Sequence, residues 1–395
     1  MASPTDWSRV IATTIVQHLR EEELTTFRKF KIFAMLESSG NVLMNQSGRG
    51  FDWNVRYRNA PVTGNTGDTP RTFSRVNMWK KAELPWRGFT TTDAIYRREM
   101  LENRGQQALV DVASKMAERL QESLEQHLSY QPYSDGSAAG KENDFHGLES
   151  FLKYNGTVDE SAAGVADVDT ATATYAPTGT DFFTGTGDRF GHPLDTYAGL
   201  STKLGYYGGG RMSGTTGKWP DVSVDPEFDF YSPVIVNYNA TSFNGAGGGQ
   251  NWKSNCVFAV REGIHQCKRN DTREAQIDLV VLDRHLYIQL LNTYKDQERI
   301  VVSKENGLKA LGFNDAITID GVEVTSEYAC PAGKGYGLSI GNMEMRCLEN
   351  QLMVAEGPFF SEETQSYRYA CSTLGNLRFK SPRNFFMLDG ITTPS

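Results

Sequence analysis

The chain of 395 residues lacks the features that mark several common classes of protein. It has no run of about 18 apolar residues, so we predict no transmembrane helix. Its first residues show neither the apolar core nor the cleavage site of a signal peptide. The five cysteines are odd in number and show no C-x-x-C spacing, which argues against a disulfide framework and against a structural zinc site. We therefore expect small buried cysteines in a reducing compartment.

Motifs of catalysis and cofactor binding are also missing. The six histidines are scattered, with no H-x-x-x-H or H-E-x-x-H spacing, and no G-x-S-x-G elbow occurs. Residues 185–191 read GTGDRFG, but no apolar strand precedes them and no amphipathic helix follows, so an ordinary loop is favoured over a dinucleotide site. The acidic runs at 21–23 and 362–363 favour a solvated face or pairing with a neighbour's arginines over a metal site. The sequence predicts no catalytic residue, cofactor or metal, and hence no enzyme.

The overall composition suits a globular chain that is rich in strands and turns. Hydrophobic residues make up 39% and charged residues 22%, which is unlike a disordered protein. Aromatic residues make up 11%, and 38 glycines favour many turns over an all-helical fold. The net charge of −8 argues against a dedicated DNA-binding protein, which would usually be basic.

Against this acidic background, residues 49–98 stand out as basic and aromatic. They hold ten basic residues and four acidic ones, a net charge of +6, so the rest of the chain carries −14. Three of the six tryptophans, Trp53, Trp79 and Trp86, lie in the same segment. Arginine and tryptophan dominate the energetic centres of protein interfaces. A basic, aromatic arm on an acidic body is the pattern expected of a protein that binds copies of itself.

The polarity of this segment predicts a long hairpin. Residues 49–59 alternate, with Phe51, Trp53, Val55 and Tyr57 on one face, which is the period of a strand. A tip rich in Pro, Gly, Thr and Asn follows at 60–73, and a second extended run covers 74–86. Because a two-stranded ribbon is not stable alone, we expect this hairpin to lie on another part of the protein.

Two helices are predicted around the hairpin. Residues 8–37 show helical spacing that includes Phe27, although the acidic cluster at 21–23 would divide it into two helices. Residues 104–131 form a stronger pattern that Pro132 ends. Its predicted core positions are Leu109, Val112, Met116, Leu120, Leu124 and Leu128.

The second half of the chain is predicted to be a β-rich domain with long loops. Residues 133–255 hold most of the Gly-rich sequence, and then a short strand is predicted at 257–260 and a buried strand at 277–282. Asp283 can cap a following helix. The pair Asp320-Gly321 between alternating strands indicates a hairpin with a type I′ turn, and further strands are expected at 366–388.

This order of elements resembles that of tailed-bacteriophage major capsid proteins of the Hong Kong 97 type. The segment GRGFDWNVRYR at 48–58 resembles the ascending strand of that family's extended loop. FHGLE at 145–149 resembles the turn after the family's spine helix, and DGVEV at 320–324 resembles an outer hairpin. SPRNFFMLDGI at 381–391 resembles the closing strand. The likeness covers nearly the whole chain through arrangement, without a sharp motif.

The resemblance implies an α+β fold with a defined set of parts. Residues 1–44 would form an N-terminal arm and 45–90 the extended loop. Residues 91–150 and 340–395 would form a peripheral domain with a spine helix at 104–131, and 151–339 an axial domain with Gly-rich loops. Such subunits assemble into hexamers and pentamers of an icosahedral phage head, built in the host bacterial cytoplasm around double-stranded DNA. The resemblance also implies a portal, a separate scaffolding protein, cement proteins and DNA bound without sequence specificity as partners. It implies no contact with a membrane.

The extended loop and the arm are expected to form the interface between subunits. The predicted interface residues are Phe27, Phe51, Trp53, Arg56, Tyr57, Arg58, Arg71, Arg75, Trp79, Lys80, Lys81 and Trp86. Pairing of the arginines with acidic residues of neighbours is favoured over contact with packaged DNA. Some family members cross-link a loop lysine to a neighbour's asparagine; Lys80 or Lys81 with Asn376 or Asn384 would be the pairs here, although salt bridges are favoured.

Two other readings stay open. An encapsulin-type nanocompartment shell has a related fold and encloses cargo enzymes instead of DNA. A β-rich soluble enzyme is the reading from a different class, and it would need convergent carboxylates for which the sequence shows no spacing.

Overall fold

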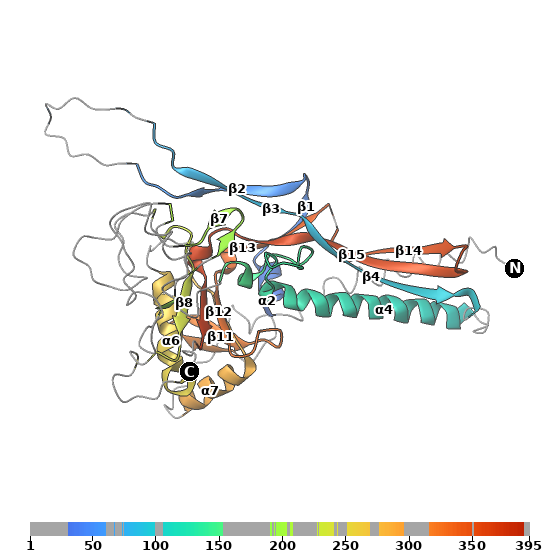
Figure 1. Ribbon diagram of the computed structural model, residues 1–395. Coiled ribbons are helices and arrows are strands. Elements are labelled where there is room, and N and C mark those ends of the chain that lie inside the picture. The colour runs from blue at the N-terminus through green and yellow to red at the C-terminus, as the bar shows by residue number, and fades with distance from the viewer. Residues whose placement is uncertain are drawn as a thin grey trace.

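A computed structural model of the chain describes residues 31–60, 67, 73, 75–98, 106–152, 190, 191, 193, 195–203, 206, 207, 227, 229–240, 243, 251–268, 276–295, 316–349 and 351–390. Figure 1 shows three parts in this region: a long helix beside a long β-ribbon, a second sheet covered by two helices, and a hairpin that projects from the body. All statements below concern these residues.

The first sheet has five strands and is organised around one long strand, β15 (Ser366–Phe379). β15 pairs antiparallel with β4, β13 and β14, and β13 pairs parallel with β1. The bounds of these strands are β1 Val42–Gln46, β4 Arg87–Tyr96, β13 Met343–Leu348 and β14 Val354–Ser361. Helix α4 lies along β4 and β15, and these elements with β14 form an elongated extension of the molecule (Figure 1).

Helix α4 (Gln106–Tyr130) confirms the predicted long helix to within two residues at each end. Its 25 residues span roughly 38 Å. The predicted core positions Met116, Leu120, Leu124 and Leu128 are buried. Leu109 and Val112 lie in the helix, but their side chains are not among those the structure describes. The 3-10 turns η1 (Gln131–Tyr133), which contains Pro132, and η2 (Leu148–Ser150) follow.

The second sheet has seven strands in the order β10-β11-β9-β12-β16-β8-β5. Their bounds are β5 Phe190–Gly191, β8 Val234–Asn237, β9 Leu279–Leu282, β10 Ile317–Ile319, β11 Val322–Ser326, β12 Gly335–Leu338 and β16 Phe386–Asp389. The predicted buried strand is confirmed as β9, and the predicted hairpin as β10–β11. Asp320 (φ 49°) and Gly321 (φ 84°) both adopt the positive φ that its tight turn needs.

The second sheet includes the last strand, β16, which pairs with β12 and β8. One sequence prediction is corrected beside this sheet. The predicted strand at 257–260 is wrong, because those residues lie inside helix α6 (Trp252–Cys267). The buried side chains Cys256, Ala259, Val260 and Gly263 follow helical spacing. The Asn251 side chain caps the helix by accepting from the Ser254 N–H at 3.1 Å.

Two apolar cores lie on the two faces of this second sheet. Within β9, Val280 and Leu282 point into the core shared with α6 and α7 (Arg284–Lys295), while Leu279 and Val281 point into the other core. This burial on both faces explains why β9 reads as a continuous apolar run. The other core also contains residues of the first sheet and of α4, so it joins the two sheets.

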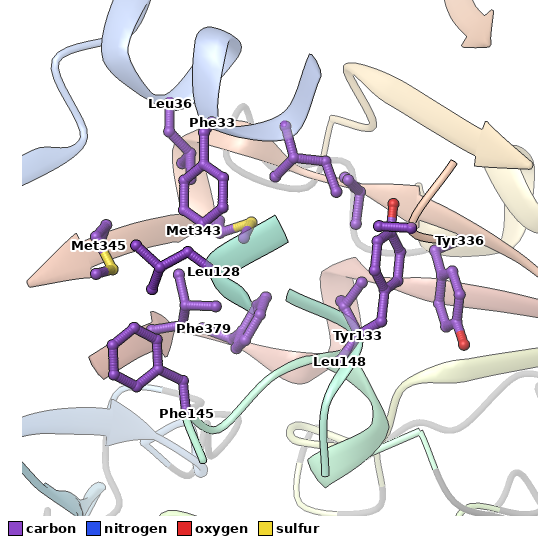
Figure 2. Packing of buried hydrophobic residues seen from close by; sticks show 14 of the residues in the cluster. Phe33, Leu36, Leu128, Tyr133, Phe145, Leu148, Tyr336, Met343, Met345 and Phe379 are labelled. Carbon is purple, nitrogen blue, oxygen red and sulfur yellow. The ribbon is translucent and has the colours of Figure 1, made fainter. Parts of the chain in front are cut away.

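Helix α2 (Lys31–Ser38) adds a side to this joint core. Figure 2 shows Phe33 and Leu36 of α2 above Met343 and Leu128, which come from β13 and α4. The helix ends before Gly40, whose φ of 69° favours glycine. The rest of the predicted helix at 8–37, including Phe27, lies outside the described residues.

The remaining described elements are short. The projecting hairpin consists of β2 (Gly50–Arg56) and β3 (Trp79–Pro85). A small ladder joins β6 (Thr196–Tyr197) to β7 (Leu200–Ser201), and the 3-10 turns η5 (Ile340–Asn342) and η6 (Pro382–Asn384) precede β13 and β16.

Candidate assembly surface

The hairpin β2–β3 has one face on the body and one face in solvent. Its register pairs Gly50 with Pro85 and Arg56 with Trp79. Burial alternates along β2, which confirms the predicted alternation. Phe51 and Val55 of β2 and Ala82 and Leu84 of β3 are buried. The outward face carries Asp52, Asn54, Arg56, Lys81 and Glu83. The second strand begins at Trp79, five residues later than the extended run predicted from residue 74.

A group of charged side chains supports the inward face. Glu344 and Arg346 of β13, Arg378 of β15 and the following Lys380 form what we call the hairpin seat. Glu344 Oε1 lies 2.7 Å from Lys380 Nζ, and its Oε2 lies 3.0 Å from Arg346 Nε and 3.3 Å from Arg378 Nε. Burial alone would raise the pKa of the Glu344 carboxyl, but the hydrogen bond from Lys380 and the charges of Arg378 and Lys380 hold it below its ordinary value.

Aromatic rings of β2 lie on the cations of this seat. The Arg378 guanidinium is 5.3 Å from the Trp53 ring and the Arg346 guanidinium is 5.5 Å from the Phe51 ring, both within cation–π range. Trp53 Nε1 also donates to the Lys380 carbonyl at 3.1 Å. The first half of the hairpin is therefore fixed by cations on aromatic faces and one hydrogen bond as well as by apolar burial.

A second support holds the hairpin farther along. Lys80 Nζ lies 4.2 Å from the ring centroid of Tyr207 and 4.8 Å from that of Tyr57. Arg58 forms an ion pair with the buried Glu227. Lys81, on the outward face, instead reaches the exposed Asp52 at 3.1 Å and Glu83 at 3.4 Å. Much of the basic charge counted in the sequence is thus engaged inside the subunit.

The root of the hairpin is clamped where β3 passes into β4. Arg87 Nη1 donates to the carbonyls of Gly136 at 2.7 Å, Lys141 at 2.9 Å and Asp144 at 2.5 Å. Burial lowers the pKa of the Arg87 guanidinium, which stays charged because arginine titrates far above neutral pH. Trp86 Nε1 donates to the Gly48 carbonyl at 2.9 Å, which ties the two strands together.

Asn376 completes this clamp from β15. Its Nδ2 donates to the Pro85 carbonyl at 2.9 Å, and its Oδ1 accepts from the backbone N–H of His146 at 2.9 Å. Burial, with a contribution from the charge of Arg87, lowers the pKa of His146 to about 4. The ring is therefore neutral near pH 7, which suits a buried hydrogen-bonding role and gives no sign of acid–base chemistry.

These contacts divide the predicted interface residues into two groups. Phe51 is 6% exposed, so the expectation that its side chain packs against a neighbour is wrong: it belongs to the subunit's own core. Trp53, Tyr57 and Trp86 are partly buried against the same core. Trp79 is 53% exposed and, with Arg56 and Arg75, remains available to another copy. Arg71 and Phe27 lie outside the described residues.

The acceptors named for a covalent cross-link are inaccessible. Asn376 is 0% exposed and Asn384 is 6% exposed, and Asn376 is held by Pro85 and His146. A lysine of a neighbouring copy would have to displace these contacts to reach the Asn376 amide, and the Asn384 amide is buried. The geometry therefore argues against a cross-link at these pairs.

The sequence missed a second exposed aromatic group at the far end of the long ribbon. We call Tyr96, Phe359, Phe360 and Tyr367 the ribbon tip. Phe359 is 58% and Tyr96 55% exposed, and the rings of Phe360 and Tyr367 lie 5.1 Å apart. In Figure 1 the ends of β4 and β14 lie at the opposite extreme from the hairpin. The adjacent Phe359 and Phe360 could have revealed this group from the sequence. Consecutive residues of a strand face opposite sides of a sheet, so a sheet with one buried face would cover only one of the two rings.

Other kinds of site are not found in the described part of the chain. Those residues contain no group of three or more His, Cys, Asp or Glu side chains arranged to hold a metal. The predicted burial of the five cysteines is confirmed. Among the helices described, none is both long and apolar enough to cross a membrane.

The arrangement of these parts is similar to that in a solved phage capsid subunit. No protein-family model matches the chain, and no curated protein matches it. The subunit in the asymmetric unit of the Cyanophage A-1(L) capsid is similar with a TM-score of 0.52 at 12% identity, over 92% of this chain and 93% of that one. The chain has the fold of a phage capsid subunit. The predicted α+β fold of the Hong Kong 97 type is thereby confirmed.

Two further solved structures are similar to the chain at lower TM-scores. The capsid of Myoviridae phage XM1 gives a TM-score of 0.47 at 11% identity, over 90% of this chain and 92% of that one. An encapsulin of Synechococcus elongatus gives a TM-score of 0.42 at 9% identity, over 91% of this chain and 89% of that one.

Proposed function

We propose that this chain is a shell-forming protein, the major capsid subunit of a tailed phage, which assembles into hexamers and pentamers around double-stranded DNA. Its role is mechanical, without catalysis. The observation that carries the proposal is the hairpin, which is fixed at its root and seat but presents Trp79 and Arg56 on a face its own subunit leaves open. A large exposed aromatic beside arginine is the composition of an interface centre.

The ribbon tip supports the same proposal from the other end of the subunit. A single association surface gives small closed oligomers, whereas a closed shell needs each subunit to meet several neighbours. The exposed aromatics of the tip lie beside Arg97 and Arg368 and beside Glu362 and Glu363, so the tip offers both charge signs to another copy. Two well-separated surfaces on one rigid fold are what a lattice of identical subunits requires.

Electron microscopy of the purified protein tests the proposal most directly. We expect uniform closed particles from the unaltered chain, and from Arg56→Glu a folded subunit that fails to form them. The matched control is Arg284→Glu, which reverses an exposed arginine on α7, away from the hairpin. If Arg56→Glu formed particles with unchanged yield, the hairpin would have no role in assembly.

The contents of the particles separate a phage head from a nanocompartment. A phage head assembled in infected cells would hold double-stranded DNA and would be accompanied by a portal and, during assembly, a scaffolding protein. Cement proteins bound to the outer surface would be a further partner. Particles isolated with an enzyme inside and no nucleic acid would instead favour the encapsulin-type reading.

A further inference from the structure

The side chain of Asn376 lies at the point where the hairpin leaves the first sheet. The ladder between β15 and β4 ends at the pair of Gly375 and Arg87, and the preceding strand β3 pairs with β2 instead. Asn376 is the next residue of β15; it is 0% exposed and contacts Pro85, the last residue of β3. Its hydrogen bonds therefore act on the root of the hairpin.

Three backbone groups determine how the Asn376 amide is turned. Its Oδ1 accepts from the backbone N–H of His146 and from that of Leu377, both at 2.9 Å. Its Nδ2 donates to the Pro85 carbonyl at 2.9 Å. A backbone N–H only donates and a backbone carbonyl only accepts, so the opposite orientation of the amide would lose all three bonds. The amide nitrogen therefore also faces the remaining neighbour, the ring of His146.

This orientation assigns the protonation state of the His146 ring. Asn376 Nδ2 lies 2.9 Å from His146 Nδ1. Since an amide nitrogen only donates, Nδ1 accepts, and the ring is neutral with its hydrogen on Nε2. A proton added to Nδ1 would set two donors against each other. Asn376 cannot relieve this by turning its oxygen to the ring without losing its three backbone partners, so a protonated His146 does not fit the arrangement.

The groups packed around His146 favour its neutral form. Burial is the main cause that lowers the pKa of His146 to about 4, and the charge of Arg87 adds to it, while the charge of Asp135 in the segment after α4 opposes it. The Tyr197 ring of β6 lies edge-on, with its centroid 6.5 Å from that of the imidazole. Burial raises the pKa of the Tyr197 hydroxyl, so it is uncharged near neutral pH. Arg87 and Asp135 are thus the charges that act on the ring.

We propose that His146, Asn376 and Pro85 form a root latch, an acid-sensitive switch that holds the hairpin root to the first sheet when His146 is neutral and opens when it is protonated. Arg87 is held separately by three carbonyls of the segment after α4, so opening frees the chain at Pro85 and leaves the start of β4 in place. The orientation of the hairpin's open face then depends on pH. The latch is a property of the single subunit and stands whether or not the chain forms shells.

Hydrogen exchange of two backbone amides measures the latch in the unaltered chain. The N–H groups of His146 and Leu377 both donate to Asn376 Oδ1, so they report on it directly. A histidine pKa of about 4 in the closed latch and about 6.5 in the open one makes opening about 30-fold more favourable at pH 5 than at pH 7.5. We expect the exchange of both amides, corrected for intrinsic rates, to rise by that factor, while β9 amides keep their exchange.

Two results from the unaltered chain would overturn the latch. One is unchanged exchange of the two reporter amides between pH 7.5 and pH 5. The other is an equal rise in the amides of β9, which would indicate a general loosening of the fold in acid instead of a local opening.

Replacing the ring assigns the pH dependence to His146. In His146→Asn the side chain offers an acceptor near the position of Nδ1 and does not titrate between pH 5 and pH 7.5, so the rise at Leu377 and at residue 146 should disappear. His146→Gln is a second variant without a titrating ring, for use if the first does not fold. A rise that persists without the ring would contradict the latch.

His285→Asn is the matched control, because it makes the same substitution at an exposed histidine of α7. Its two reporter amides should keep the rise of about 30-fold between pH 7.5 and pH 5. If the rise were lost in this variant too, the pH dependence would not belong to His146, and the latch would be wrong.

Discussion

The seven-stranded sheet and the hairpin β2–β3 are fixed by different kinds of contact. The sheet has apolar cores on both faces, and Phe386 of β16 sits in a slot between Gly263 of α6 and Gly337 of β12. One face of the hairpin lies on the cations Arg378 and Arg346, which contact the rings of Trp53 and Phe51. The other face lies in solvent. Packing on both faces holds the sheet in one arrangement. The hairpin keeps one face in solvent, and this is the face that we propose contacts other copies.

The largest effect should come from crowding the slot in the sheet. A Cβ at Gly337 would overlap the Phe386 ring, which Gly263 confines on its other side. We expect Gly337→Ala to lower the free energy of unfolding by about 3 kcal/mol, measured by chemical denaturation. Gly341→Ala is the control, since nothing lies within 4 Å of its added methyl group. Equal stability of the two variants would mean that the slot is not tightly packed.

A pair of tryptophans should separate the two faces of the hairpin. Trp53→Ala removes a ring from the seat and should cost about 2 kcal/mol of subunit stability, because the ring is partly buried. Trp79→Ala removes an exposed ring and should leave the subunit's melting temperature unchanged while reducing particle yield. Thermal melts of unassembled subunits, with particle counts by microscopy, give both readouts. A lower melting temperature for Trp79→Ala would place that ring in the subunit's own core.

The smallest effect is expected from titration of the hairpin seat. Since the pKa of Glu344 is lowered in the folded protein, its ionised form contributes stability at pH values above the ordinary glutamate range. That contribution is lost as pH falls through the folded-state pKa. Glu344→Gln should therefore reduce the difference in unfolding free energy between pH 7 and pH 3, measured by urea denaturation at each pH. An unchanged difference would show that the seat cations do not depend on this carboxylate.

Local patterns in the sequence were sufficient wherever one segment carries its own signal. α4 has a continuous stripe from Met116 to Leu128, and Asp320-Gly321 has the chemistry of its turn. The sequence pattern gave a wrong prediction at 257–260, because this short apolar run was assigned to a strand without regard to the helical spacing of the residues around it. It also missed β4, whose run of threonines has little apolar periodicity and becomes a strand because β15 pairs with it along ten residues.

By itself, the sequence determined the spine helix, the hairpin with one apolar face and the concentration of basic and aromatic residues in it. These depend on periodicity and turn chemistry, which are local. Only the tertiary structure decided which charges remain available, since Lys80, Arg58 and Arg87 find partners 50 or more residues away in the chain. It also left Phe359 and Tyr96 uncovered. Such outcomes depend on contacts between distant segments, which no local pattern encodes.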